Sequence, residues 1–93
     1  LKLNPGSFDA HNNLGFALGK KGSMAEALEE LSVAVNLRPN DADAYNNLGI
    51  VYGMQKAYGL AVEQFQKAIA LQPDNPKYSY NLANAYRLKL QGN

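Results

Sequence analysis

Apolar residues recur along this chain at spacings of three and four positions, the pattern that one face of an α-helix produces. The first such stretch follows Ser7, a preferred helix-capping residue, and stops at Gly22, a residue typical of helix C-termini. Its predicted apolar face consists of Ala10, Leu14, Ala17 and Leu18. No stretch alternates apolar and polar residues as a β-strand does, so the pattern predicts an all-α fold.

The second helical stretch begins at Ser23 and ends before Pro39. Glu26 stands three residues after Ser23, the spacing of a capping box, in which each side chain bonds the backbone N–H at the other position. The apolar stripe of this helix is Ala27, Leu28, Leu31, Ala34 and Val35. The two stretches together predict a helical hairpin.

Three further helices follow the same signals. The third is predicted to start near Asp41, and the fourth ends before Pro73. The fifth starts at Asn75, with Pro76 in the first helical position. The apolar stripes of these helices are Ala44, Leu48, Val51 and Tyr52; Ala61, Phe65, Ala68 and Ile69; and Leu82, Ala85, Tyr86 and Leu90.

The chain also repeats itself with a period of 34 residues. Residues 8–41 and 42–75 share several aligned identities, among them Asn12/Asn46, Asn13/Asn47, Leu14/Leu48, Gly15/Gly49 and Pro39/Pro73. We therefore expect one domain over residues 1–93. Its predicted parts are the tail of a preceding repeat (1–7), two whole repeats (8–41 and 42–75), and the first helix of a further repeat or a capping helix (76–93).

The repeat carries a motif. Its second copy reads Tyr45-x2-Leu48-Gly49-x2-Tyr52, then Ala61-x3-Phe65, then Pro73. This pattern resembles the tetratricopeptide repeat (TPR), although Ser79 replaces the usual aromatic residue in the last helix. The resemblance implies a right-handed solenoid of antiparallel helix pairs, with about two and a half repeats and five helices. It also implies a non-catalytic module for protein–protein interaction.

Small residues stand where the two helices of a hairpin must approach closely. These positions are Gly15, Gly49 and Ala83 on the first helices, with Ala27 and Ala61 on the facing helices. A larger side chain at these positions would push the helices apart. Leu14, Leu48 and Leu82 are expected to lie between layers of the stack.

In the TPR family, the first helix of each repeat lines a concave groove. Asn13, Asn47 and Asn81 fall on that face in 34-residue register and predict a ladder of amides along it. A side-chain amide can bond both the N–H and the C=O of an extended peptide. The arrangement resembles the asparagine ladder in the repeats of O-linked N-acetylglucosamine transferase, which implies peptide capture. The alternative is that these asparagines only bond a neighbouring helix.

Other residues on the same predicted face complete the candidate site. Phe16 and Ile50 favour hydrophobic side pockets, and an exposed apolar patch usually has a partner. The carboxylate clamp of some TPR domains is poorly matched, since only Asn47 and Lys77 fit it. The candidate peptide-binding residues are Asn12, Asn13, Phe16, Asn46, Asn47, Ile50, Lys77, Asn81 and Asn84.

Composition and charge exclude several functions. The formal net charge is +1 with no basic stripe, which argues against nucleic acid, and the chain contains no cysteine. The longest apolar stretch, Leu48 to Met54, is too short for a membrane helix. No phosphate loop, metal-ligand cluster or nucleophile motif is visible, so we expect no cofactor and no enzyme activity. The single histidine, His11, is expected to be a packed or partly exposed core residue rather than a catalytic base. The carboxylates of the second helices, Glu30 among them, are expected to face solvent and not to pair with it.

Two other functions stay open beside peptide binding. The module could join copies of itself through terminal helices that lack a covering layer, or it could be the regulatory arm of a larger enzyme. The chain begins with Leu1 rather than Met, so we expect it to come from a longer protein. No targeting motif indicates a compartment.

Overall fold

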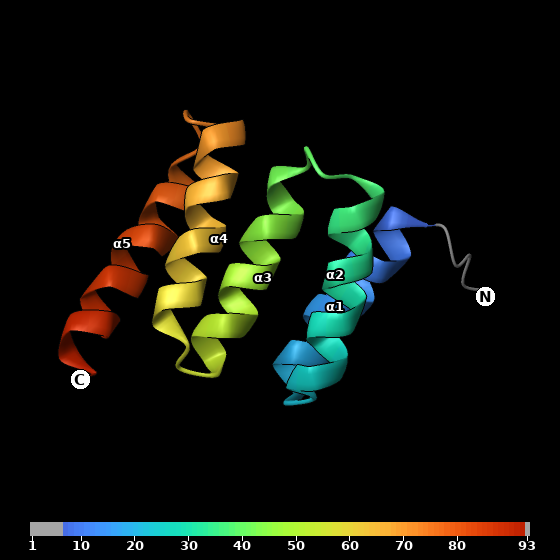
Figure 1. Ribbon diagram of the computed structural model, residues 1–93, viewed down its shortest axis with the longest axis horizontal. Coiled ribbons are helices and arrows are strands. Elements are labelled where there is room, and N and C mark those ends of the chain that lie inside the picture. The colour runs from blue at the N-terminus through green and yellow to red at the C-terminus, as the bar shows by residue number, and fades with distance from the viewer. Residues whose placement is uncertain (1–6, 93) are drawn as a thin grey trace.

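The protein folds into five α-helices, seen in a computed structural model that describes residues 7–92 (Figure 1). The helices are α1 (Phe8–Lys21), α2 (Met24–Leu37), α3 (Ala42–Met54), α4 (Tyr58–Leu71) and α5 (Pro76–Gln91). No strand is present within the described range. The predicted all-α fold of five helices is confirmed. The expected tail of a preceding repeat lies outside the described residues except for Ser7.

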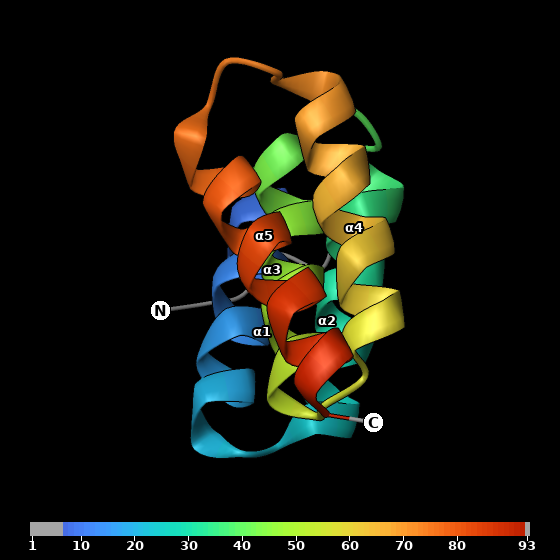
Figure 2. The same ribbon diagram turned by 90° about the vertical axis from the view of Figure 1, so that its left-hand side faces the viewer.

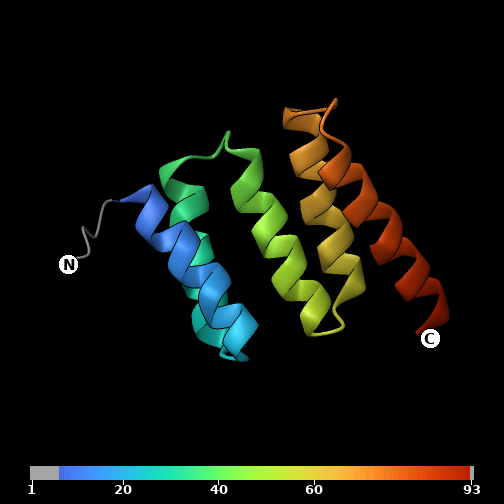
Figure 3. The ribbon, with the colours of Figure 1, turned by 180° about the vertical axis from the view of Figure 1, so that it is seen from behind.

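The helices form two layers (Figure 2). The odd-numbered helices make one layer, and α2 and α4 make the other. Within the stack, α1 packs against α2, α3 packs against α4, and α5 packs against α4. Figure 3 views the molecule from the side of α1, α3 and α5, which form one continuous surface that we call the α1–α3–α5 face.

Side-chain caps fix three helix starts as the sequence predicts. The Ser7 side chain accepts a hydrogen bond from the Ala10 N–H at 3.2 Å. Asp41 accepts hydrogen bonds from the backbone at the start of α3, and Asn75 accepts one from the Lys77 N–H at 3.0 Å. Each cap satisfies an N–H group that has no partner inside the helix.

The capping box expected at Ser23 is not formed. Ser23 does precede α2, but its side chain makes no capping bond. Its backbone N–H is already bonded to the Leu18 carbonyl at 2.9 Å, closing a turn in which Gly22 is left-handed with φ of 97°. The Ser23 N–H is therefore not available to Glu26, and the reciprocal pair cannot form.

The α3–α4 turn has the same form, with Lys56 at φ of 64° in the place of Gly22. The Ala57 N–H bonds the Tyr52 carbonyl at 2.9 Å, and the Lys56 N–H bonds the Gly53 carbonyl at 2.9 Å. Both hairpins therefore close through a Schellman motif. Lys56 occupies a conformation that costs a residue with a Cβ more than it costs glycine.

Close helix approach depends on two glycines, as expected, whereas Ala83, the third residue predicted at such a contact, is exposed. A methyl carbon built on Gly15 would lie 2.6 Å from the Leu31 Cγ, and one built on Gly49 would lie 2.5 Å from the Phe65 ring. Ala27 and Ala61 are fully buried on the facing helices. Leu48 is buried with Ala27, Leu31 and Val51, between the first hairpin and α3.

The predicted apolar face of α1 needs correction. The buried residues of α1 are Phe8, Asn12, Gly15 and Gly19. Ala17 is exposed, and Ala10, Leu14 and Leu18 are only half-buried. The equivalent residues of α3 are covered by the hairpin before them, whereas no described helix precedes α1.

The predicted stripe of α5 is also only partly buried. Ala85 is buried and Leu82 is half-buried, but Tyr86 is 43% exposed and Leu90 is 82% exposed. No described helix follows α5 to cover them. Tyr78, absent from the predicted stripe, is instead the largest side chain that is almost fully buried, packed against Ala42 and Ala68.

Candidate functional site

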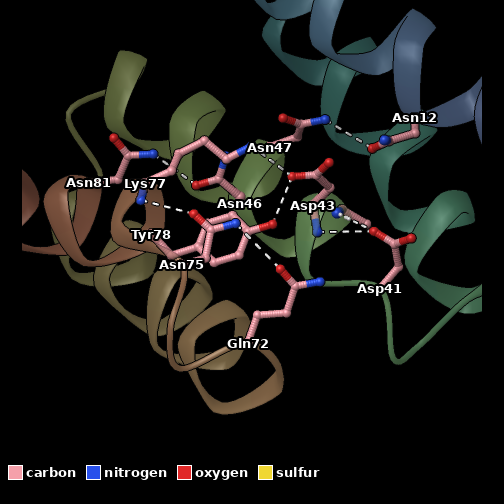
Figure 4. Close-up of polar contacts among 11 residues, drawn as sticks. Asn12, Asp41, Asp43, Asn46, Asn47, Gln72, Asn75, Lys77, Tyr78 and Asn81 are labelled. Atoms are coloured by element: carbon pink, nitrogen blue, oxygen red, sulfur yellow. Dashed lines mark hydrogen bonds and ion pairs between the residues drawn. The ribbon is translucent and has the colours of Figure 1, made fainter.

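Two asparagines of the predicted ladder are held by asparagines of the preceding repeat (Figure 4). The Asn47 Nδ2 donates to the Asn12 Oδ1 at 3.0 Å, and the Asn81 Nδ2 donates to the Asn46 Oδ1 at 2.8 Å. Each bond links residues 35 positions apart. The repeat thus places two separate amide pairs, one joining α1 to α3 and the other joining α3 to α5.

Asn12 and Asn46 are buried, at 9% and 3% exposure. This burial corrects the expectation that they contact a peptide beside the ladder. Their buried side-chain oxygens accept the hydrogen bonds from Asn47 and Asn81, and these bonds fix the orientation of the two donors. Each oriented amide uses one of its two N–H groups in this bond, which leaves its second N–H and its carbonyl oxygen for another partner.

Asn13 begins the row and is exposed. The acceptors of Asn47 and Asn81 lie 35 positions earlier in the chain, and none of the described residues stands at that position for Asn13. Asn47 and Asn81 therefore do bond a neighbouring helix, as the alternative to peptide binding predicts. This bonding leaves one N–H and the carbonyl oxygen of each amide for a ligand.

Asp43, near the start of α3, holds α5 in place through two hydrogen bonds (Figure 4). Its Oδ1 accepts from the Tyr78 hydroxyl at 2.8 Å and from the Lys77 Nζ at 3.1 Å. Partial burial raises the pKa of Asp43, but the bonds from Tyr78 and Lys77 outweigh it and leave that pKa below 3.8. Burial, followed by the bond to Asp43, raises the pKa of Tyr78 to about 12. Lys77, a candidate ligand residue, therefore has an intramolecular partner.

A hollow of about 130 Å³ opens between α3, α4 and α5. It brings together three candidate residues, Ile50, Asn81 and Asn84. The hollow is also lined by residues outside the list of candidate peptide-binding residues, among them Gly53, Tyr58, Phe65, Ala85 and Leu88. The lining is largely apolar, with two amides among it, which is the composition of a small ligand site.

Phe16 does not line this hollow. It is half-buried on α1, with the Lys20 ammonium 5.6 Å from the centre of its ring. Tyr80 and Met54 are 68% and 41% exposed. These side chains add apolar area to the odd-numbered helices, and none of them lines the hollow between α3, α4 and α5.

His11 has a partner, contrary to the expectation. Its Nδ1 lies 2.6 Å from the Glu30 Oε1, so Glu30 faces His11 across the first hairpin rather than open solvent. Within residues 7–92, no group of His, Cys, Asp and Glu side chains could hold a metal ion. None of the described helices has the length and apolar character needed to cross a membrane.

Comparison with known proteins agrees with this architecture. One family model, described as a TPR repeat, matches residues 20–56, and another, described as a tetratricopeptide repeat, matches residues 42–75. The crystal structure of YrrB, described as a TPR protein with an unusual peptide-binding site, matches with a TM-score of 0.80 and 31% identity. That match covers 84% of this chain and 40% of the YrrB chain.

No curated protein matches the chain. The family matches together span residues 20–75, which include the whole second predicted repeat. TPR domains are protein-interaction modules, and the helix pairs and spacing seen here are theirs. The chain belongs to the tetratricopeptide-repeat family.

Proposed function

We propose that the α1–α3–α5 face is a non-catalytic site that binds an extended peptide, with Asn47 and Asn81 bonding its backbone. The observation that carries the proposal is the pair of hydrogen bonds to Asn12 and Asn46. These bonds hold each amide in one orientation before a ligand arrives. An oriented side chain loses less conformational entropy on binding than a free one.

The chemistry of the row suits a peptide backbone. A peptide group offers one N–H and one C=O, and each oriented asparagine keeps one N–H and one carbonyl oxygen for them. Backbone contacts of this kind give affinity, while neighbouring pockets give specificity. The description of YrrB as having a peptide-binding site supports the same reading of this smaller stack.

The proposal is tested with an array of immobilised, end-blocked decapeptides of varied sequence. Binding of the wild type is compared with that of Asn47→Ala, which removes an oriented amide. Asn36→Ala is the matched control, because Asn36 is an exposed asparagine on α2, in the other layer. Circular dichroism establishes that both variants are folded.

Loss of two backbone hydrogen bonds is expected to weaken binding by about tenfold in Asn47→Ala, and Asn36→Ala should bind as the wild type does. N-methylation of successive peptide nitrogens then identifies the bonded backbone group. A methyl group that abolishes the difference between wild type and Asn47→Ala marks the partner of Asn47. Equal binding by the folded Asn47→Ala variant would refute the backbone grip.

Self-association is a second candidate, favoured by the outer side of α5. Tyr86 and Leu90 are exposed there, although the Tyr86 hydroxyl accepts a hydrogen bond from the Gln66 Nε2 at 3.1 Å. A second copy could cover this surface. Sedimentation over a hundredfold range of concentration decides the question, since a constant monomer mass removes this candidate.

A further inference from the structure

The two junctions between successive hairpins differ at one pair of positions. At the first junction, a methyl carbon built on Gly19 would lie 2.8 Å from the Val51 Cγ2, so Val51 already fills the space beside that glycine. At the second junction, Gly53 and Ala85 stand 34 residues later, at the equivalent positions. A methyl carbon built on Gly53 would meet nothing within 4 Å.

The hollow between α3, α4 and α5 therefore has a cause in the sequence. Alanine at position 85 lacks the two methyl groups that valine carries at position 51, and Gly53 contributes no side chain. Both residues line the hollow. The second junction is left unfilled where the first is packed.

The size and lining of the hollow limit what it can hold. Its volume is about 130 Å³, and a cavity of about 150 Å³ lined by apolar side chains holds one benzene molecule. One aliphatic side chain of leucine size matches this volume more closely than a larger indole ring does. Asn81 lies in the lining, so a peptide held by that amide would have a side chain beside the hollow.

The charge of α5 adds a second constraint. This helix carries Lys77, Arg87 and Lys89 and no acidic residue. Lys77 is paired with Asp43, but the Arg87 guanidinium donates to the neutral Asn84 side chain, which lines the hollow. The positive charge beside the hollow complements an acidic ligand.

We propose that the hollow beside Gly53 and Ala85 is a specificity pocket for one leucine-sized aliphatic side chain in an acidic peptide segment. This inference rests on the proposed peptide-binding function and sharpens it. The first junction offers no matching space, so the pocket sets the register of the peptide on the row. Asn81 bonds the backbone beside the anchor, and Arg87 attracts the flanking carboxylate.

The test is a titration of ¹⁵N-labelled protein, followed by NMR, with blocked peptides of the form acetyl-Ser-Ser-Asp-X-Asp-Ser-Ser-amide. X is leucine, alanine or tryptophan, and a fourth peptide replaces both aspartates around leucine with lysines. The amide signals of Gly53, Asn81 and Ala85 report occupancy of the pocket. Signals of Asn13 and Asn47 report contact elsewhere on the α1–α3–α5 face.

The leucine peptide is expected to shift the pocket signals and to bind about tenfold more tightly than the alanine peptide. Tryptophan should bind more weakly than leucine, and the lysine peptide about threefold more weakly than the aspartate peptide at low salt. Equal affinity for leucine and alanine, or tighter binding of tryptophan, overturns the pocket. Equal affinity for the lysine and aspartate peptides overturns its acidic preference.

Two variants fill the pocket from opposite sides. Ala85→Val copies the first junction, and Gly53→Ala adds one methyl group to open space. Both should lose about tenfold in affinity for the leucine peptide and little for the alanine peptide. Ala83→Val is the matched control, because Ala83 is exposed on the same helix and does not line the hollow.

If Ala85→Val does not fold, the affinity of Gly53→Ala for the leucine peptide still decides the question. The methyl group added at position 53 meets nothing within 4 Å, so this variant is expected to fold. Unchanged leucine affinity in a folded pocket variant would refute the pocket. Shifts confined to Asn13 and Asn47 would refute the pocket while leaving the proposed function intact. No shift with any of the four peptides at millimolar concentration would count against both.

Discussion

The hydroxyl of Tyr78 donates a hydrogen bond to the Asp43 Oδ1 at 2.8 Å, and this bond ties α5 to the start of α3. Asp43 lies one helical turn before Asn47, on the same side of α3. Its carboxylate accepts hydrogen bonds from two residues of the neighbouring helix α5, Tyr78 and Lys77. The same tyrosine packs its ring against Ala42 and Ala68, so one side chain joins the last helix to the second hairpin by both burial and polar contact.

Alkaline pH is expected to destabilise the protein through Tyr78. Its pKa is raised from 10.0 to about 12, so the folded state holds this proton more tightly than the unfolded state does. The stabilisation is complete below pH 10 and is lost as the pH rises toward about 12. Urea unfolding of the wild type and Tyr78→Phe across this range measures it. The wild type should lose stability more steeply, and parallel curves would contradict the assignment.

Alanine at two glycines of α3 is expected to have opposite effects. At Gly49, the new methyl group would lie 2.5 Å from the buried Phe65 ring, and such overpacking costs about 1 to 3 kcal/mol. At Gly53 the methyl group meets no atom within 4 Å, and replacing a helical glycine gains about 0.5 to 1 kcal/mol. Chemical denaturation of the two variants measures both changes. Equal shifts of the two midpoints would disprove the close contact at Gly49.

Truncation of Leu48 should be costly. Leu48 is 7% exposed and packs among Ala27, Leu31 and Val51, so Leu48→Ala is expected to lose about 2 to 5 kcal/mol through transfer and cavity effects. Leu60→Ala is the matched control, because Leu60 is 44% exposed on α4. A denaturant melt in which Leu48→Ala loses less than about 1 kcal/mol would place Leu48 outside the core.

Glycine at position 56 is expected to stabilise the fold. Lys56 has φ of 64°, in the left-handed region that costs L-residues about 1 to 2 kcal/mol. Lys56→Gly removes this strain but adds freedom to the unfolded chain, so the expected net gain is about 1 kcal/mol or less. Gly22→Lys is the reciprocal change and should destabilise the first hairpin. Thermal melts of both variants check the pair, and a loss of stability in Lys56→Gly would contradict this account.

Local signals in the sequence predict much of this fold. Ser7, Asp41 and Asn75 cap helices as expected, because a capping bond involves only residues within one turn. The 34-residue register also places Asn47 and Asn81 correctly on equivalent helices. Helix starts and the equivalent positions of successive repeats can therefore be predicted from the sequence alone.

The remaining features depend on contacts that reach beyond a single helix. Ser23 looks like half of a capping box, but a turn closed by Leu18 takes its N–H. Tyr78 stands where both earlier repeats have alanine, so the repeat pattern does not mark it as a core residue. The hollow follows from alanine at position 85 in place of the valine at position 51, a difference whose meaning appears only when the helices are placed side by side.

The amide bonds bear on how such stacks can be recombined, because each joins two consecutive repeats. A graft of residues 42–75 would carry Asn47 away from its acceptor, Asn12. The same graft would bring Asn46 without its donor, Asn81. The shortest segment with a complete pair runs from Asn12 to Asn47 and begins and ends inside helices. Chimeras joined in the loops between repeats would thus keep the helical scaffold but lose one oriented amide at every junction.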